Sequence, residues 1–220
     1  MIPTRIFLDL DDVCNTFTPY ALMSVGCQID ALSFDGIDPS WGRDIVTAAN
    51  ALHQTRSFTT ASFWNSIGRS VWATVPESAE FASLLRWCEE CVGTDNVCIL
   101  SCPTLDPDCL AGKLEWIHAH FPKRFHRQYL IGPRKYFCAR PDALLIDDSD
   151  ENVNKFREWG GQAIIVPRPW NSLSRIRSTL SYLLLELRIK FDPQRAMTSQ
   201  SQSLIAKIFK KIMSHPETMR

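Results

Sequence analysis

The sequence lacks an excess of charge of either sign, because its 24 basic residues equal its 24 acidic residues. No global field would therefore draw the chain to nucleic acid, and any anion site must be built from local groups. The sequence also lacks an apolar run approaching the roughly 20 residues that cross a bilayer. Arg5 and Asp9 interrupt its start before a signal-peptide-like stretch develops. These absences predict a cytoplasmic protein and argue against membrane and nucleic-acid partners.

A disulfide framework is missing as well, although the chain has eight cysteines. The cysteines are scattered, and several lie in apolar segments, which is typical of reduced and buried thiols. Zinc remains an alternative, since thiolate pairs at the spacing of Cys88, Cys91, Cys98 and Cys102 do bind zinc. However, Cys88 and Cys91 fall on a predicted helix and Cys98 in a predicted strand, which would turn their thiols to different surroundings.

What the chain does contain is a regular alternation of strands and helices. At 220 residues with 45% apolar content, it can bury one sizeable core and still carry an insertion or a tail. Continuous apolar runs predict buried parallel strands over residues 6–8, 97–100, 128–131, 144–146 and 163–166. Helical patterns occupy residues 78–92, 106–121 and 151–159, and the chain turns helical again beyond Ser172 through Leu187. The alternation predicts an α/β fold with a doubly wound, Rossmann-like parallel sheet of about five strands.

Two of these helices have clear start signals. Ser78 is the expected N-cap of the first, and Asp106 followed by Pro107 is the favoured opening of the second. The predicted buried stripe of the second helix consists of Leu110, Leu114, Ile117 and Phe121. That orientation would turn Lys113 toward solvent or a neighbouring acid rather than toward a strand end.

The alternation is interrupted after the first strand. Residues 15–76 contain helical patches and several aromatics but no clear strand, so we expect a small helical cap inserted there. The catalytic core would then comprise residues 1–14 and 77–190. Residues 191–220 are expected to form a C-terminal helical tail, whose amphipathic, basic segment over 204–213 could pack on the core or touch a partner.

Two predicted strands run directly into clusters of carboxylates. The first strand is followed by Asp9, Asp11 and Asp12, and the fourth by Asp147, Asp148 and Asp150. Open α/β sheets bind ligands at the carboxyl ends of their strands, so both clusters should converge into one pocket. Confined carboxylates raise one another's pKa, and a hard cation would offset them. Mg²⁺ is the natural candidate, because it favours carboxylate oxygens and bridges them to phosphate.

Such a pocket suits phosphoryl transfer. Asp9 could attack phosphorus and form an aspartyl-phosphate, while Asp11 protonates the leaving oxygen and later deprotonates the hydrolytic water. Ser101, after the second strand, can donate its hydroxyl to phosphate. Lys135, shortly before the fourth strand, could offset charge on the attacked group, and Lys113 competes for that role.

In this order the residues resemble the four motifs of the haloacid-dehalogenase (HAD) superfamily, namely an Asp-x-Asp strand end, a Ser/Thr strand end, a lysine and a terminal Asp-Asp pair. More narrowly, residues 8–13, 99–103, 113–117 and 144–148 resemble the 5'(3')-deoxyribonucleotidase branch. The resemblance covers roughly Arg5 to Val166. It implies a magnesium-dependent phosphatase that acts on nucleoside monophosphates.

The resemblance also implies a set of site residues. Asp9 is the implied nucleophile and Asp11 the acid/base, while Ser101 and Lys135 hold the phosphate. The implied magnesium ligands are Asp9, Asp11 through its backbone carbonyl, Asp147 and Asp148. Aromatics of the cap would stack on the base, and the candidates in this chain are Phe63, Trp64 and Trp72. These aromatics could equally form the core of the cap.

Three functions remain open from the sequence. The leading one is hydrolysis of a nucleoside monophosphate, preferably a deoxynucleotide. The second is hydrolysis of another small phosphate ester or of a nucleic-acid 3'-phosphate. The third is a catalytically silent HAD-like binding module, against which the presence of both Asp9 and Asp11 argues. Asp12 stands where the branch usually has glycine, and an extra carboxylate beside the metal could change metal preference or tolerance for phosphate charge. The oligomeric state, including a homodimer, stays open.

Overall fold

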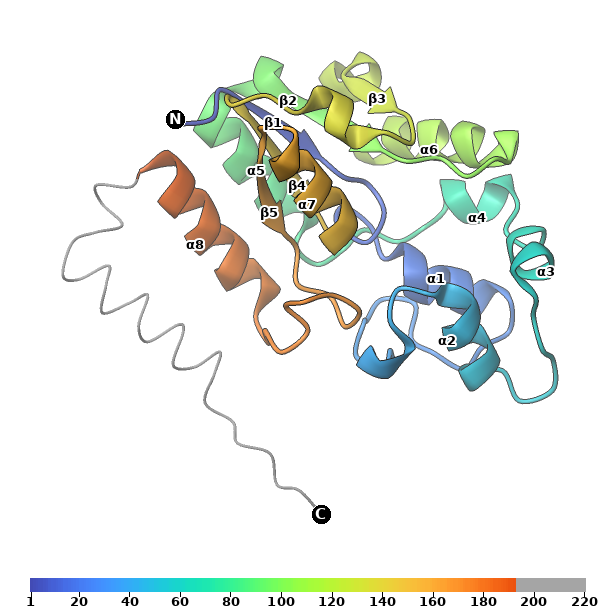
Figure 1. The fold of residues 1–220 in the computed structure, drawn as a ribbon. Coiled ribbons are helices and arrows are strands. Elements are labelled where there is room, and N and C mark those ends of the chain that lie inside the picture. Colours follow the sequence, from blue (N-terminus) through green and yellow to red (C-terminus); the bar gives the residue numbers. More distant parts are fainter. Residues whose placement is uncertain (193–220) are drawn as a thin grey trace.

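The structure is a computed structural model that describes residues 1–192 (Figure 1). Five strands form one all-parallel sheet in the order β3-β2-β1-β4-β5. The strands are β1 (Arg5–Leu8), β2 (Val97–Ser101), β3 (Tyr129–Ile131), β4 (Ala143–Asp147) and β5 (Gln162–Ile165). The predicted doubly wound sheet is thereby confirmed, with all five strands where apolar runs indicated them. The amphipathic segment over residues 204–213 lies outside the described residues.

Helices cover both faces of the sheet, as Figure 1 shows. They are α5 (Phe81–Val92), α6 (Pro107–His120), α7 (Asp150–Glu158) and α8 (Thr179–Phe191), with short 3₁₀ segments η2 (Thr94–Asn96), η3 (Lys123–Arg127) and η4 (Lys135–Cys138). Alternate residues of β1 point to opposite faces. Ile6 and Leu8 join the core beneath α5, α6 and α8, whereas Phe7 packs against Phe156 of α7. No described helix has the length and apolarity needed to cross a membrane.

The insertion (residues 15–76) is helical, as predicted. It contains α1 (Phe17–Ser24), η1 (Pro39–Trp41), α2 (Ile45–Leu52), α3 (Thr60–Trp64) and α4 (Arg69–Ala73). An isolated bridge between Asn15 and Glu77 closes its two ends. In Figure 1, α1, α2 and α3 lie together beyond one end of the sheet, and α4 returns the chain to α6.

Two helix starts differ from the prediction. The first helix begins at Phe81, and Ser78 does not cap it. The Ser78 hydroxyl instead donates to the carbonyl of Val13 at 2.7 Å, which ties the end of the insertion to the loop after β1. The last helix starts only at Thr179, after a turn-rich segment. By contrast, Asp106 caps α6 as expected, since its carboxylate accepts the N–H of Asp108.

The buried face of α6 is not the predicted one. Leu110 is 43% exposed, and the buried residues are Cys109, Gly112, Lys113, Trp116 and Ile117. Lys113 does contact an acid, Asp11, but the prediction that it faces away from the strand ends was wrong, because its side chain is 1% exposed and points inward. Gly112 explains the rotation. A Cβ at this position would lie 2.4 Å from the Cβ of Trp72 and 2.6 Å from the backbone oxygen of Arg69, so α4 packs directly on the glycine.

This close approach makes Gly112→Ala a test of the helix contact. We expect the substitution to lower the free energy of unfolding by about 1–3 kcal/mol, because α4 and α6 must separate to admit the methyl group. Urea denaturation followed by circular dichroism measures the change. Gly132→Ala is the matched control, since a Cβ there meets nothing within 4 Å. Equal stability of the two variants would contradict the contact.

Candidate active site

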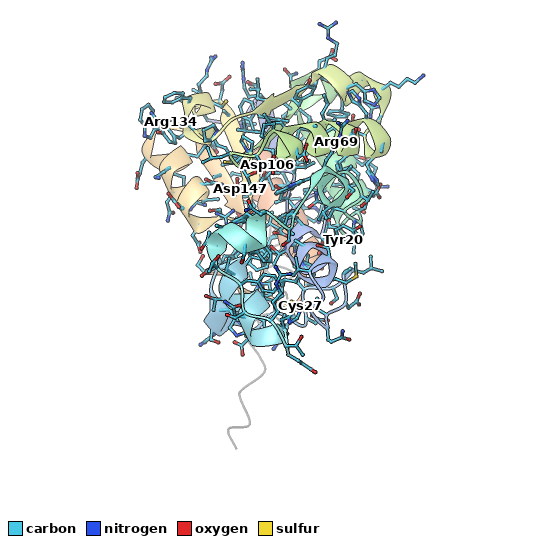
Figure 2. All side chains as sticks on the ribbon, turned by 90° about the vertical axis from the view of Figure 1, so that its right-hand side faces the viewer. Tyr20, Cys27, Arg69, Asp106, Arg134 and Asp147 are labelled. Atoms are coloured by element: carbon cyan, nitrogen blue, oxygen red, sulfur yellow. The ribbon has the colours of Figure 1, made fainter. Side chains whose placement is uncertain are left out.

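The carboxyl ends of β1 and β4 meet at the centre of the sheet. Leu8 pairs with Ile146, and the backbone N–H of Asp9 donates to the carbonyl of Ile146 at 3.0 Å. Carboxylate oxygens of Asp9, Asp147 and Asp148 consequently lie within 4.8 Å of one another, and all three residues are buried. The structure therefore brings one acid of the first predicted cluster and two of the second together at this edge of the sheet. In Figure 2, Asp147 is seen where the sheet domain meets the helices of the insertion.

One lysine contacts an acid from each of these two strand ends. Lys135, at the start of η4, places its Nζ 2.6 Å from Oδ1 of Asp9 and 2.7 Å from Oδ2 of Asp147, with its side chain 3% exposed. Burial alone would lower the pKa of this ammonium group, but the attraction of both carboxylates raises it above its ordinary value. Lys135 is therefore a permanent cation in the site, as its predicted role requires.

The cluster contains three buried carboxylates and only one buried lysine. Burial raises the pKa of Asp9 well above its usual value, and Lys135 only partly opposes this while Asp147 and Asp148 add to it. Asp147 is fixed in place, because the amide of Asn152 donates to both its oxygens at 3.1 Å and the N–H of Ser149 donates to Oδ1 at 2.8 Å. A donor set made only of oriented carboxylate oxygens suits a hard cation such as Mg²⁺.

Asp11 lies outside this trio and has its own cation. Its carboxylate is in contact with Nζ of Lys113, which also donates to Oγ of Ser101 at 2.8 Å and to the carbonyl of Cys102 at 2.7 Å. Lys113 thus links the ends of β1 and β2. Ser101 is fully buried, and by accepting from Lys113 it keeps its own hydroxyl hydrogen for another acceptor. Local periodicity predicts the wrong face for Lys113 and therefore misses these contacts at the strand ends.

The side chain of Asp12 binds Thr18 of α1 and does not join the carboxylate trio. The backbone of Asp12 is in the left-handed region, with a φ of 57°. Glycine is favoured in this conformation, and glycine is also the usual residue at this position in the deoxyribonucleotidase branch that the sequence resembles. The carboxylate of Asp12 accepts the N–H and the hydroxyl of Thr18 at 2.8 and 2.6 Å, and its carbonyl accepts Nε of Arg168 at 2.7 Å. Burial, followed by repulsion from Asp148, raises the pKa of Asp12 to about 7. The extra acid is therefore bound to the first helix of the insertion.

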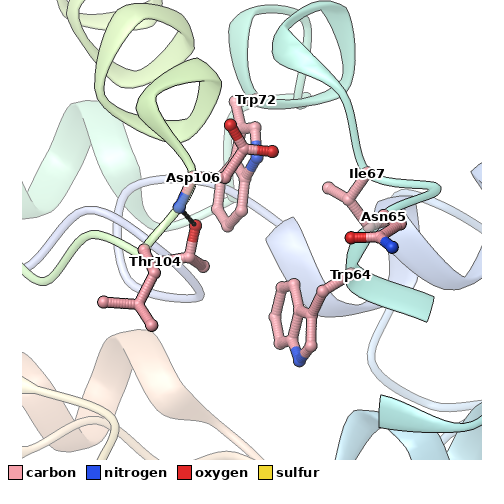
Figure 3. Close-up of a pocket in the computed structure, with 7 residues that line it drawn as sticks. Trp64, Asn65, Ile67, Trp72, Thr104 and Asp106 are labelled. Atoms are coloured by element: carbon pink, nitrogen blue, oxygen red, sulfur yellow. Dashed lines mark hydrogen bonds between the residues drawn. The ribbon is translucent and has the colours of Figure 1, made fainter. Parts of the chain in front are cut away.

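A cavity of about 270 Å³ opens between the insertion and the loop after β2 (Figure 3). It is lined by Trp64, Asn65, Ile67, Trp72, Thr104, Leu105 and Asp106. Two of the three predicted cap aromatics, Trp64 and Trp72, therefore lie in its wall. The third, Phe63, is fully buried and packs edge-on against Phe58 and Trp64.

The two aromatic rings that line this cavity are parallel, and a third ring, that of Phe17, stacks on one of them. Phe17 stacks on Trp72 with centroids 4.2 Å apart, and the ring of Trp64 lies parallel to that of Trp72 at 6.2 Å. Phe17 was not among the predicted residues, although it is the first aromatic after the acidic motif. Nζ of Lys113 is 5.1 Å from the ring of Trp72, so the aromatic wall adjoins the cation that holds Asp11.

The zinc alternative finds no support among the described residues. The only group of His, Cys, Asp or Glu within residues 1–192 that could hold a metal ion is the trio of Asp9, Asp147 and Asp148. Cys88 is buried and Cys102 is exposed, so these thiols do face different surroundings. The one candidate metal-binding group in this part of the chain therefore consists of carboxylates.

No curated protein matches the sequence significantly. Among solved structures, a β-phosphoglucomutase from Clostridium difficile is 14% identical, with 89% of this chain and 100% of that chain covered and a TM-score of 0.45. A HAD family hydrolase from Deinococcus radiodurans R1 with bound phosphate and sodium is 15% identical, with 82% and 88% covered and a TM-score of 0.44. The magnesium complex of a HAD family enzyme from Bacteroides thetaiotaomicron is 12% identical, with 78% and 96% covered and a TM-score of 0.38.

A family model gives the decisive match. The model described as "5' nucleotidase, deoxy (Pyrimidine), cytosolic type C protein" matches residues 2–178, which include every element of the sheet and all the site residues described above. This agrees with the resemblance to the deoxyribonucleotidase branch. The chain therefore belongs to this family and is a hydrolase of the phosphatase and 5'-nucleotidase class, with a small phosphate ester as substrate.

Proposed function

We propose that the protein is a magnesium-dependent nucleotidase that hydrolyses nucleoside monophosphates, deoxynucleotides by preference, through an aspartyl-phosphate at Asp9. The observation that carries the proposal is the setting of the Asp9 carboxylate. It is buried at the junction of β1 and β4, is held by the ammonium group of Lys135, and stands beside a second acid, Asp11, with a separate cation. Two acids with separate partners suit two separate chemical roles.

In the first half-reaction Asp9 is the nucleophile. Its Oδ1 accepts the N–H of Leu10 at 2.8 Å and contacts Lys135, which leaves Oδ2 as the attacking oxygen. A bond forms between Oδ2 and phosphorus while the bond from phosphorus to the ester oxygen breaks. Asp11 gives its proton to that leaving oxygen, and the nucleoside departs as an alcohol.

In the second half-reaction Asp11 acts as the base. It takes a proton from a water molecule as the water oxygen bonds to phosphorus, and the bond to Asp9 breaks to release inorganic phosphate. Lys113 contacts Asp11 and donates to Ser101, so it fixes the acid/base relative to the hydroxyl that would hold the phosphoryl group. Ser101 and Lys135 offer donors to the phosphoryl oxygens.

Asp9, Asp147 and Asp148, together with the backbone carbonyl of Asp11, would hold the metal ion. When bound, Mg²⁺ withdraws charge from the phosphoryl oxygens, which makes attack by an anionic carboxylate feasible. The aromatic wall supplies the base site, since a planar base can lie against Trp64 or Trp72 while Asn65 and Thr104 offer polar contacts at the cavity.

A substrate panel tests the reaction. Purified protein is assayed for phosphate release from 5'- and 3'-nucleotides and sugar phosphates, with magnesium and with EDTA. Asp9→Asn should lower kcat by roughly 10³-fold or more, because the amide is a poor nucleophile. Asp95→Asn, an exposed change in η2 at the opposite end of the sheet, is the control and should be unaffected. Undiminished release by Asp9→Asn, or release in EDTA equal to that with magnesium, would refute the proposal.

Lys113 gives a second test. In Lys113→Met we expect kcat to fall about 100-fold, because Asp11 loses the cation that orients it and Ser101 loses a hydrogen-bond donor. Steady-state kinetics across pH 5–9 measure the loss and any displacement of the acid/base profile. Lys155→Met removes a lysine from an exposed ion pair with Glu151 and should behave as the wild type. A Lys113→Met profile that matches the wild type would exclude this role.

Trp64 tests the base site. Trp64→Ala should raise KM for nucleotides about tenfold, because stacking on an aromatic ring contributes roughly 1–3 kcal/mol per base. It should leave KM for ribose 5-phosphate, which has no base, nearly unchanged. Trp159→Ala, at a half-exposed position after α7, serves as the control. An equal loss with both substrates would mean that Trp64 supports the fold rather than the base.

A further inference from the structure

The insertion places an arginine on the acidic cluster. Arg43 lies between η1 and α2, and its Nη1 donates to Oγ of Ser149. Its Nη2 is 3.8 Å from Oδ1 of Asp148. Ser149 follows the acid pair directly and caps α7 with the same Oγ, which accepts the N–H of Asn152. A residue of the insertion therefore contacts the end of β4 through two neighbouring core residues.

Arg43 differs from the other two cations of the site. The side chains of Lys113 and Lys135 are 1% and 3% exposed and come from segments that follow β2 and β3. The side chain of Arg43 is 54% exposed and comes from the insertion. Among the described residues, it is the one basic side chain of the insertion that forms an ion pair with a carboxylate of the cluster.

The geometry of Asp148 shows what Arg43 affects. Oδ2 of Asp148 accepts Nε1 of Trp170 at 2.7 Å, so Oδ1 is the oxygen that faces the guanidinium. The carboxylate of Asp148 belongs to the trio that could hold a metal. A metal ion bound to this trio and the guanidinium of Arg43 would therefore compete for the carboxylate of Asp148.

The charge balance of the site indicates how the contact between Arg43 and Asp148 affects substrate binding. Four carboxylates of the site, those of Asp9, Asp11, Asp147 and Asp148, face only two buried lysines. A phosphate monoester brings up to two further negative charges. The guanidinium is within the electrostatic reach of Asp148, Asp147 and Asp9, so it offsets part of the repulsion that the ester meets.

We propose that Arg43 is a positioning residue of the active site that acts through Asp148, lowering the negative charge that the phosphate ester meets at the cost of weaker metal binding. The inference rests on the proposed function, because it assumes an anionic substrate and a metal at the acid trio. It predicts opposite effects of removing the arginine. Metal binding becomes tighter because Asp148 loses a competing cation, and ester binding becomes weaker because the site is more negative.

Three variants test this. Arg43→Gln removes the charge, and Arg43→Lys keeps it. Arg56→Gln removes the charge of another exposed arginine of the insertion, which lies over the ring of Phe58 and not beside a carboxylate of the site. Isothermal titration calorimetry with MgCl₂ alone measures metal binding without turnover. Steady-state kinetics at saturating magnesium then separate KM from kcat.

For Arg43→Gln we expect the magnesium dissociation constant to fall about three- to fivefold and KM to rise by a similar factor, as suits a half-exposed charge. We expect kcat to change less than twofold, Arg43→Lys to restore both constants, and Arg56→Gln to match the wild type. Weaker magnesium binding in Arg43→Gln, or unchanged binding and KM, would overturn the proposal. If the wild type hydrolyses no ester, the proposed function fails, and the calorimetric comparison still decides whether Arg43 competes at Asp148.

Discussion

Asp9 and Asp147 share a single buried cation, the ammonium group of Lys135, and the rest of the site is arranged around this contact. Two adjacent strands cannot both end in buried carboxylates unless a positive charge offsets the cost of removing those groups from water. The strand order sets β1 beside β4, and η4 then brings Lys135 to the point between them. Negative charge remains after this pairing, which is the physical reason to expect a metal ion there.

The contact between α4 and α6 joins the chemistry to the cavity. Gly112 lets α4 pack on α6, and Trp72 of α4 consequently lies next to Lys113 of α6. Lys113 in turn contacts Asp11 and Ser101. This one helix contact therefore positions both the aromatic wall of the cavity and the lysine that contacts Asp11. A substitution on either side of the contact should affect base recognition and chemistry together.

The strands and the convergence of the acids were predictable from the sequence, because apolar runs that end in aspartates mark buried strands and the carboxyl ends of parallel strands share one edge. The face of α6 was not predictable in this way. Gly112 and Lys113 lie on its buried side without any apolar signature, and Leu110 is exposed. The sequence also does not predict a place for Arg43 in the site, because only the fold of the insertion brings this residue to Asp148. Contacts between distant segments, rather than local periodicity, decide these positions.

In the proposed mechanism, Asp9 carries the phosphoryl group. Beryllium fluoride mimics that group when it binds a nucleophilic carboxylate, and ¹⁹F NMR of the protein with beryllium fluoride and magnesium detects the adduct directly. We expect bound fluoride resonances for the wild type and their loss in Asp9→Asn, with Asp95→Asn unaffected. Resonances that persist in Asp9→Asn, or none in a wild type that releases phosphate from nucleotides, would contradict it.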